Sequence, residues 1–185
     1  MPANQIRIIG GQWRGRKLRL HAHAGLGLRP TPDRVRETLF NWLGQDLTGR
    51  RTLDPFAGSG ALSLEALSRG ASLAVAIERE RTLAESLQAA AARLGTAALE
   101  VHCAEAFAYL ARELRCFDVV FLDPPFAEPD WERLLPLAVA RLAPTGALYA
   151  EAPAPIDAPS GFEVWRRDKA GKVHYHLLRH IARAG

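Results

Sequence analysis

The sequence predicts an α/β domain with a doubly wound, mostly parallel sheet, and three observations support this fold class. From Thr52 onward, short apolar strands alternate with Gly-rich turns and helices, which is the pattern of repeated βα units. The continuous apolar run over 117–122 is typical of a strand buried on both faces, as parallel strands are. Two strand-like segments near the end predict an antiparallel hairpin at the sheet edge. With 185 residues and 48% hydrophobic composition, we expect one domain with a small appendage.

The first elements are predicted from caps and periodicity. Pro30 and Pro32 precede a helix over 33–43, with Thr31 or Asp33 as its cap. A short strand over 51–54 leads to a helix over 61–68 that ends at Gly70. A second strand, 73–77, ends at Glu78. An Ala-rich helix over 80–94 is stopped by Gly95.

The remaining elements continue the alternation. A strand over 98–102 is followed by a helix over 106–114, where apolar residues recur at helical spacing. The buried strand 117–122 is followed by an amphipathic helix over 131–142, a loop at 144–146 and a strand over 147–150. The closing hairpin pairs strands 162–167 and 173–178 through a turn at 169–172. The division that we expect is an extension over 1–28 and a larger α/β domain over 29–185, in which 29–50 is a bridge.

A Gly-rich turn at the first strand predicts a ligand site. It comprises Asp54, Phe56, Ala57, Gly58, Ser59 and Gly60. Glycines let the backbone approach a ligand, and the helix start after them offers free N–H groups. The third glycine of a dinucleotide fingerprint is absent, because Ser63 stands in its place. The carboxylate of Asp54 disfavours a pyrophosphate and suits a cation, such as the sulfonium of S-adenosylmethionine.

Acids at the ends of the next two strands extend this site. Glu78, with Arg79 beside it, follows Gly60 at nearly the spacing at which an acid binds ribose hydroxyls. Glu105 is placed to accept from an adenine amine, and the N–H of Ala106 to meet a ring nitrogen. Each acid alone also suits a surface or helix-start position. Their coincidence at one sheet edge is what predicts a cofactor site.

Asp123-Pro124-Pro125-Phe126 ends the most apolar strand and predicts a second ligand position. The prolines hold the backbone extended and leave carbonyl oxygens free. Asp123 and a carbonyl can accept from the two N–H groups of an exocyclic amine, while Phe126 stacks on the ring. We therefore expect a planar amine-bearing base here. A proline-rich strand exit without chemistry is the alternative.

Basic charge is concentrated at the start of the chain. Residues 1 to 40 hold eight Lys and Arg against two acidic residues, although the net charge of the whole chain is only +4. Trp13 and turn glycines are interleaved with these charges, which favours an ordered hairpin that binds nucleic acid over a solvated tail. The predicted RNA contacts are Arg7, Trp13, Arg14, Arg16, Lys17, Arg29 and Arg34.

Other features exclude several classes of protein. No apolar stretch suits a membrane span or a signal peptide, so a cytoplasmic protein is expected. Cys103 and Cys116 lack metal or disulfide spacing and are expected to be reduced and buried. His174 and His176 share a strand face, but no third ligand is evident, so we expect no metal and surface histidines.

The motifs together resemble the RsmD family of bacterial methyltransferases, which act on a guanine N2 amine of 16S ribosomal RNA. The resemblance rests on residues 6–17, 29–37, 53–60 and 123–126, and it spans nearly the whole chain. It implies a Rossmann-like class I methyltransferase fold with seven strands, S-adenosylmethionine as donor, and small-subunit particles or a late precursor as substrate. The family commonly has Asp or Asn where Glu105 stands.

By position, the resemblance implies that Gly58-Ser59-Gly60 holds the methionine part of the donor, Glu78 the ribose, Glu105-Ala106 the adenine, and 123–126 the target base. We expect a monomer. DNA amine methylation is the main enzymatic alternative, although the chain has no room for a target-recognition domain. A non-catalytic RNA-binding assembly factor is the alternative from another class.

Overall fold

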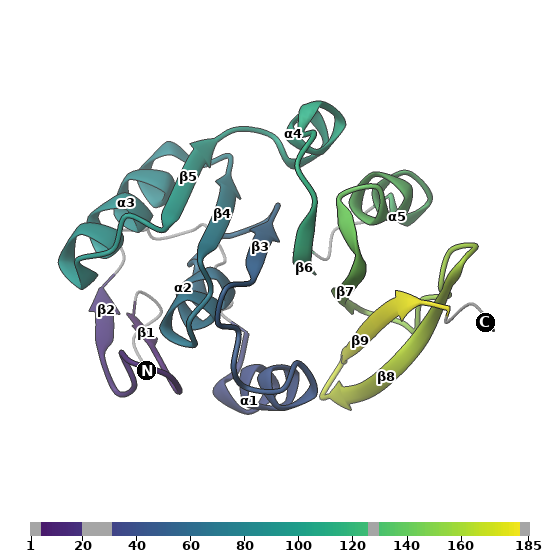
Figure 1. Cartoon of the computed structure of the whole chain (residues 1–185), viewed down its shortest axis with the longest axis horizontal. Helices are drawn as coiled ribbons and strands as arrows, with labels where there is room; N and C mark the ends of the chain where they lie inside the picture. The colour runs from purple at the N-terminus through teal and green to yellow at the C-terminus, as the bar shows by residue number, and fades with distance from the viewer. Residues whose placement is uncertain (1–4, 20–30, 126–129, 182–185) are drawn as a thin grey trace.

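The architecture comes from a computed structural model of the chain, which describes residues 5–19, 31–125 and 130–181 (Figure 1). Seven strands form one sheet in the order β5-β4-β3-β6-β7-β9-β8, and β1 and β2 form a separate antiparallel pair. The strands are β1 Gln5–Arg7, β2 Lys17–Arg19, β3 Arg51–Asp54, β4 Leu73–Glu78, β5 Leu99–Cys103, β6 Phe117–Leu122, β7 Leu142–Ala152, β8 Phe162–Ala170 and β9 Val173–His180. The helices are α1 Asp33–Trp42, α2 Ala61–Ser68, α3 Arg81–Leu94, α4 Ala106–Arg112 and α5 Trp131–Val139.

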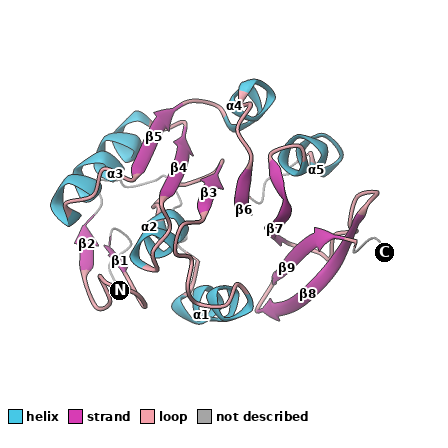
Figure 2. Cartoon of the chain, in the orientation of Figure 1, coloured by secondary structure: helices cyan, strands magenta, loops and turns pink. Residues whose placement is uncertain are grey.

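The sheet confirms the predicted α/β class. β3 to β7 pair in parallel, whereas β9 runs antiparallel to both β7 and β8. The C-terminal hairpin therefore forms the sheet edge as predicted, with the reversed strand β9 one position inside it (Figure 2). Because β9 begins beside the end of β7, the tip of the hairpin lies at the carboxyl edge of the parallel strands.

The start of β7 differs from the prediction. Residues 144–146 were expected to form a loop, and α5 was expected to continue to Leu142, but the helix ends at Val139 and β7 begins at Leu142. The pairing of β6 with β7 shifts in register between Phe117 and Val119. This irregularity accommodates Pro144, which cannot donate to a regular ladder. A Cβ on Gly146 would lie 2.9 Å from the Phe117 carbonyl oxygen, so only glycine fits there.

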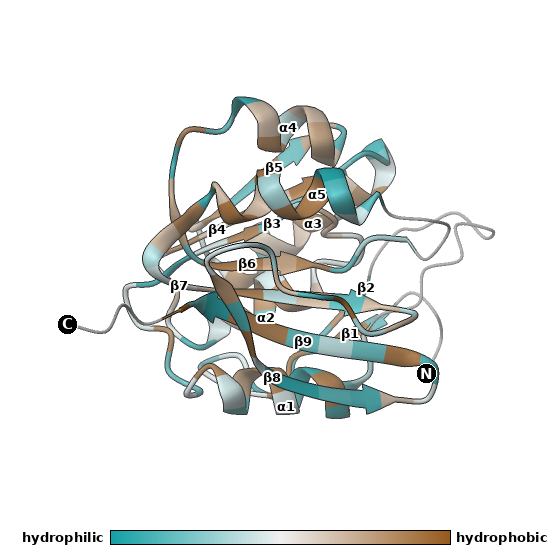
Figure 3. Cartoon of the chain, turned by 90° about the vertical axis from the view of Figure 1, so that its right-hand side faces the viewer, coloured by the Kyte–Doolittle hydropathy of each residue, from teal (hydrophilic) through white to brown (hydrophobic). Residues whose placement is uncertain are grey.

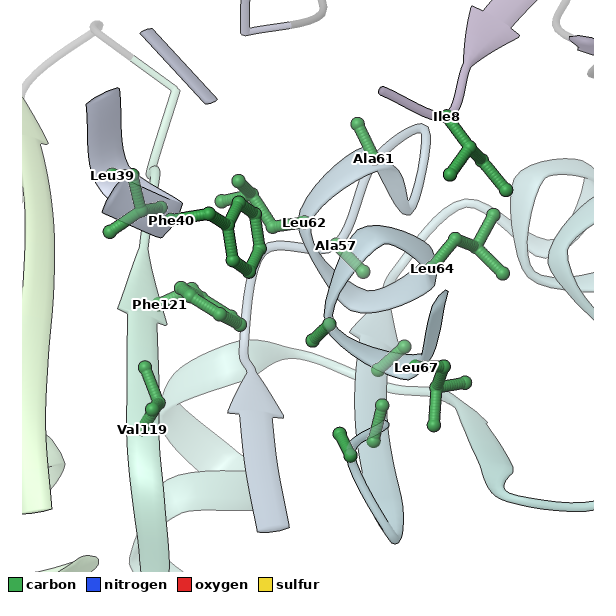
Figure 4. Close-up of a cluster of buried hydrophobic side chains, with 14 of the residues drawn as sticks. Ile8, Leu39, Phe40, Ala57, Ala61, Leu62, Leu64, Leu67, Val119 and Phe121 are labelled. Atoms are coloured by element: carbon green, nitrogen blue, oxygen red, sulfur yellow. The ribbon is translucent and has the colours of Figure 1, made fainter. Parts of the chain in front are cut away.

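The two faces of the sheet bury separate apolar clusters. One cluster combines α1, α2 and α3 with the N-terminal segment, and the other combines α4 and α5 with the opposite face. Hydropathy colouring shows β6 as an apolar strand between the helices of the two faces, whereas the edge strand β8 is largely hydrophilic (Figure 3). Alternation along β6 sends Phe121 toward α1, where its ring centroid lies 6.2 Å from that of Phe40 (Figure 4).

The described part of the N-terminal segment is fixed to the end of α2. Ile8 is fully buried and lies over α2 beside Leu64 (Figure 4). The Trp13 N–H donates to Ser68 Oγ over 2.9 Å, and that hydroxyl donates to the Gly10 carbonyl over 2.6 Å. Segment and domain therefore share one core. The predicted boundary after residue 28 falls outside the described residues.

Two predictions about burial are wrong. Both cysteines are free, as expected, but both are exposed. Cys103 ends the edge strand β5, which has a neighbour on one side alone, and Cys116 lies just before β6. His176 is buried, because β9 lies between β7 and β8 and not at the edge; its Nδ1 lies 3.4 Å from the Ala150 carbonyl oxygen.

Candidate active site

The carboxyl ends of four strands carry acidic side chains at one edge of the sheet. Asp54 ends β3, Glu78 ends β4, Asp123 follows β6, and Glu151 lies near the end of β7. In strand order these acids occur as Glu78, Asp54, Asp123 and Glu151. By alternation they all share the sheet face that packs on α1, α2 and α3. This is the edge at which open α/β sheets bind ligands.

Asp54 is a buried carboxylate that is only partly satisfied. Its residue is 2% exposed, and Oδ2 accepts a hydrogen bond from Ser63 Oγ over 2.9 Å. Oδ1 has no hydrogen-bond partner among the described residues. Burial raises the pKa of Asp54 to about 7, although Ser63 and the nearby Phe56 N–H oppose the shift. A cation placed at Oδ1 would stabilise the charged form.

The turn after Asp54 has the backbone geometry that its glycines allow. Gly58 and Gly60 have φ of 49° and 73°, in the left-handed region. The Gly60 N–H closes the turn on the Ala57 carbonyl over 2.6 Å. Gly60 caps α2 without a side-chain hydrogen bond, so the first amides of the helix face the turn. Phe56 and Ser59 lie in the same turn and are partly exposed.

Glu78 lies beside this turn. Burial raises the pKa of Glu78, and the Glu80 N–H, which donates to Oε1 over 2.8 Å, opposes the shift. Arg79 is exposed, and its side chain points to Glu80 with 3.9 Å between Arg79 Nε and Oε1. The Ala104 N–H donates to the Glu78 carbonyl over 3.2 Å, which brings the end of β5 against the end of β4.

The predicted adenine contacts lie next along this edge. Glu105 is exposed at the start of α4, and Ala106 is buried. A cavity of about 460 Å³ opens nearby between β5 and α4, but none of the predicted cofactor residues lines it. Asp54, Glu78 and Glu105 instead follow one another over the ends of β3, β4 and β5.

Asp123 accepts a hydrogen bond from a residue far away in the sequence and lies near two other acids. Thr31 Oγ1 donates to Asp123 Oδ2 over 3.2 Å, and Thr31 is itself buried. Burial, the charge of Glu151 and the charge of Asp54 raise the pKa of Asp123 well above its usual value, in that order of size, while Thr31 lowers it. Pro124 is buried and Pro125 is exposed. Phe126 and Arg29 lie outside the described residues.

The sequence reasoning missed two members of this site. Thr31 was assigned only as a helix cap, yet α1 has no side-chain cap bond and the hydroxyl binds Asp123 instead. Glu151 was not singled out, although it directly follows the predicted strand 147–150. Its approach to Asp123 depends on the pairing of β6 with β7. An acid following an apolar strand at the same edge was the available signal.

The basic residues predicted to bind RNA divide into two groups. Arg7, Arg14, Arg16, Lys17 and Arg34 are exposed. Trp13 is 8% exposed and belongs to the core cluster, so it anchors the segment and its ring is not available to stack on a base. The sequence places Trp13 between charged residues, but burial against Ser68 and α2 decided its role.

A buried ion-pair network links the N-terminal segment to α1 and α2. Glu65 is fully buried and accepts from Arg69 Nε over 2.9 Å, from the Ile9 N–H over 2.9 Å and from Arg36 Nη1 over 3.4 Å. Arg36 also donates to the Arg7 carbonyl over 2.9 Å and to the Thr31 carbonyl over 3.3 Å. Arg36 therefore connects the hairpin to the residue that holds Asp123.

Comparisons with known proteins show the family of this chain. A family model described as "Conserved hypothetical protein 95" matches residues 6–179. Ribosomal RNA small subunit methyltransferase D of Escherichia coli strain K12 is 42% identical over 97% of this chain and 92% of its own length. The Haemophilus influenzae protein of the same name is 38% identical over 95% and 94%. The chain belongs to the RsmD family.

Solved structures agree with the RsmD assignment. The E. coli methyltransferase yhhF superposes with a TM-score of 0.87 at 42% identity, covering 97% of this chain and 99% of that chain. A 16S rRNA guanine-N2 methyltransferase of T. thermophilus, in complex with AdoMet and guanosine, gives 0.70 at 22% identity, over 95% of this chain and 49% of that chain. At that identity the likeness shows the shared class I methyltransferase fold. In this RsmD-family chain, none of the described helices is long and apolar enough to cross a membrane.

Proposed function

We propose that this protein transfers a methyl group from S-adenosylmethionine to the exocyclic N2 amine of a guanine in 16S ribosomal RNA. Membership of the RsmD family and the names of its relatives support this reaction. The observation that carries the proposal is the position of Asp123. It lies one strand away from the donor-type turn of Asp54, and Pro124 and Pro125 follow it.

The donor site suits a cationic ligand. Asp54 Oδ1 is buried without a hydrogen-bond partner among the residues described, and burial raises the pKa of Asp54 to about 7, so a cation beside this oxygen would stabilise the charged carboxylate. The glycine turn of 58–60 brings backbone amides close to the methionine carboxylate, Glu78 accepts from the ribose hydroxyls, and Glu105 with Ala106 meets the adenine. When bound, S-adenosylmethionine supplies a methyl group on a sulfonium that is activated for nucleophilic attack.

At the acceptor side, the chain's contribution is to hold and polarise an amine. The lone pair of the guanine N2 is delocalised into the ring, which makes the nitrogen a weak nucleophile. Asp123 and a proline carbonyl accept from the two N–H groups, favour a more tetrahedral nitrogen and stabilise the positive charge that develops on it. The N–C bond forms as the S–C bond breaks, and the proton then leaves to water or to Asp123 Oδ1 or Oδ2. Alignment of the two substrates supplies much of the rate.

Two exposed basic elements are the proposed RNA contacts. The first is the N-terminal segment with Arg34, where a hollow of about 540 Å³ is lined in part by Arg7 and Arg14. The second, which the sequence reasoning did not assign, is the tip of the β8–β9 hairpin with Lys169 and Lys172. Their side chains contact the phosphates on either side of a nucleotide that is splayed into the site.

The proposed substrate is the 30S subunit or a late precursor in the cytoplasm, and the proposed acting form is a monomer. A target that is already unstacked in a particle needs less energy to enter the pocket than a base in a duplex. A non-catalytic assembly factor would need neither a buried Asp54 with one unbonded carboxylate oxygen nor an Asp123 of raised pKa.

Radiolabelled methyl transfer to 30S particles, naked 16S rRNA and DNA, followed by nucleoside analysis, tests the proposal. We expect N2-methylguanosine in particles. Asp123→Asn should abolish transfer while leaving the affinity for S-adenosylmethionine, measured by calorimetry, within a few-fold. Methylation of DNA alone, or a wild-type protein that binds no donor, would overturn the proposed reaction. A large loss of donor affinity in the variant would place Asp123 in the donor site.

A further inference from the structure

Glu151 is a buried acid beside the proposed target pocket that has no role in the reaction described above. Its residue is 4% exposed, and its carboxylate Oε1 accepts from Tyr149 Oη over 2.9 Å. Leu122 of β6 pairs in parallel register with Ala150 of β7, so Asp123 and Glu151 are the next neighbours along the two strands. Both follow the alternation that faces α1 and α2.

The two carboxylates interact. After burial, the charge of Glu151 is the largest cause that raises the pKa of Asp123. Burial and Glu151 also raise the pKa of Tyr149. Placing two negatively charged carboxylates side by side in a partly buried site costs free energy. A glutamine at position 151 would accept from Tyr149 without that cost. A ligand that presents two adjacent hydrogen-bond donors would offset it.

The row of acids also has an order. Along the strands β3, β6 and β7, Asp54 comes first, Asp123 second and Glu151 third. Asp54 faces the donor side, where its Oδ1 has no hydrogen-bond partner among the described residues. Within these residues, no group of three acidic, histidine or cysteine side chains is close enough to hold a metal ion. The row therefore suits a ligand that spans it, with its reactive end nearest Asp54.

We propose that Glu151 accepts a hydrogen bond from the ring N1–H of the target guanine while Asp123 holds its N2 amine. The inference rests on the proposed function and deepens it, because it assigns the group that selects the base. Guanine alone among the four RNA bases carries a ring N–H next to an exocyclic amine. Adenine and cytosine present a ring acceptor beside their amines, which would face the Glu151 carboxylate unfavourably.

The order of the acids fits this assignment. In guanine the N2 amine must lie nearest the donor methyl. The ring nitrogen N1 is bonded to the same carbon, C2, that carries the amine. Asp123 lies between Asp54 and Glu151 in strand order, so an amine held at Asp123 places N1 toward Glu151. Tyr149 fixes the position of the Glu151 carboxylate, since its hydroxyl donates to Oε1 and its ring is fully buried. Glu151 is thus a binding residue that sets specificity.

The test compares guanine with 2-aminopurine at the target position of reconstituted small-subunit particles. 2-Aminopurine keeps the amine at position 2 but has an acceptor at N1. We expect the wild-type protein to methylate guanine at least about 100-fold more efficiently in kcat/KM, because a site built to accept an N–H rejects an analogue that lacks it. Equal efficiency on the two bases would overturn the inference without any variant.

Glu151→Gln supplies the second measurement, because its amide can donate to the 2-aminopurine N1. We expect a loss of about 100-fold on guanine, a smaller loss on 2-aminopurine, and donor affinity within a few-fold of wild type. Tyr149→Phe is the matched control: it removes the hydroxyl that binds Glu151 but keeps the acceptor, so the base preference should persist. Equal losses on both bases in Glu151→Gln would assign Glu151 a structural role. If wild-type protein methylates no guanine at all, the proposed function itself fails.

Discussion

Thr31 Oγ1 donates a hydrogen bond to Asp123 Oδ2 over 3.2 Å, and so joins two residues that lie 92 positions apart in the chain. Thr31 is buried just before α1, and its carbonyl accepts from Arg36. The bond opposes the rise in the pKa of Asp123 that burial and the neighbouring acids cause. The segment that contains Thr31 therefore positions the carboxylate of the distant segment that begins at Asp123.

Thr31→Val removes that bond while keeping the shape of the side chain. We expect methyl transfer to fall about tenfold, which is the value of one hydrogen bond to a charged group, with donor affinity unchanged. The pKa of Asp123 should rise further, so the acidic limb of the rate profile should move to higher pH. Single-turnover rates across pH measure both effects, and Thr31→Ser should restore them. A full rate in Thr31→Val would exclude a positioning role.

Asp54 links stability to pH. Its folded pKa is about 7 against an ordinary value of 3.8, so between these values the folded state holds a proton that the unfolded chain has released. Stability should fall as pH rises through that window and level off above it. Asp54→Asn does not titrate, so from pH 4 to pH 8 its stability should rise relative to wild type, by up to about 4 kcal/mol.

Urea unfolding of the donor-free protein at the two pH values measures this difference. Glu132→Gln, on the exposed face of α5, is the control and should follow the wild-type curve. The same Asp54 variant should bind S-adenosylmethionine at least about tenfold more weakly, because the charge opposite the sulfonium is gone. Parallel stability curves for Asp54→Asn and wild type would show that Asp54 is not the buried acid of raised pKa.

Gly11 lets the N-terminal segment dock on α2. Its φ is +73°, and a Cβ there would lie 1.8 Å from the Ser68 carbonyl oxygen, which accepts from the Gln12 N–H. Gly15 has a similar φ of +83° with nothing within 4 Å of a Cβ. Both substitutions by Ala carry about 1 kcal/mol of left-handed strain, and Gly11→Ala adds a backbone clash.

We therefore expect Gly11→Ala to destabilise the fold by about 2 kcal/mol more than Gly15→Ala, as measured by thermal unfolding. It should also weaken binding to RNA, because the basic segment loses its position on α2. Equal effects of the two substitutions would mean that Ser68 moves aside without cost, and that the docking of this segment is loose.

Substitutions in the two basic elements should change the salt dependence of RNA binding more than substitutions of other surface arginines. Replacing Arg14, Arg16 and Lys17 with Ala should lower the slope of log K against log salt by about 2 to 3, since each lost phosphate contact contributes nearly 1. Lys169 and Lys172 replaced together should lower it by about 1 to 2. Replacing Arg81, Arg112 and Arg133, which are exposed on α3, α4 and α5, is the matched control. Filter binding to 30S particles measures each slope, and an unchanged slope would remove that element from the RNA surface.

Much of the fold was predictable because its signals are local. Gly70 and Gly95 end helices, and the strand 117–122 has no polar residue other than Asp118, so the βα alternation was visible along the chain. The start of β7 was not predicted, since Pro144 and Gly146 are typical of a loop. Only pairing with β6 shows that they form an irregular part of a strand.

The sequence alone determined which residues have the chemistry for this site. Each of these residues ends or directly follows a strand: Asp54, the glycines of 58–60, Glu78 and Asp123. Because parallel strands end at a common edge, their convergence follows from local patterns. The tertiary structure decided the rest. It buried Trp13, turned Thr31 toward Asp123 and set Glu151 beside it, because burial and strand register depend on contacts between segments far apart in the chain, and no local pattern carries those contacts.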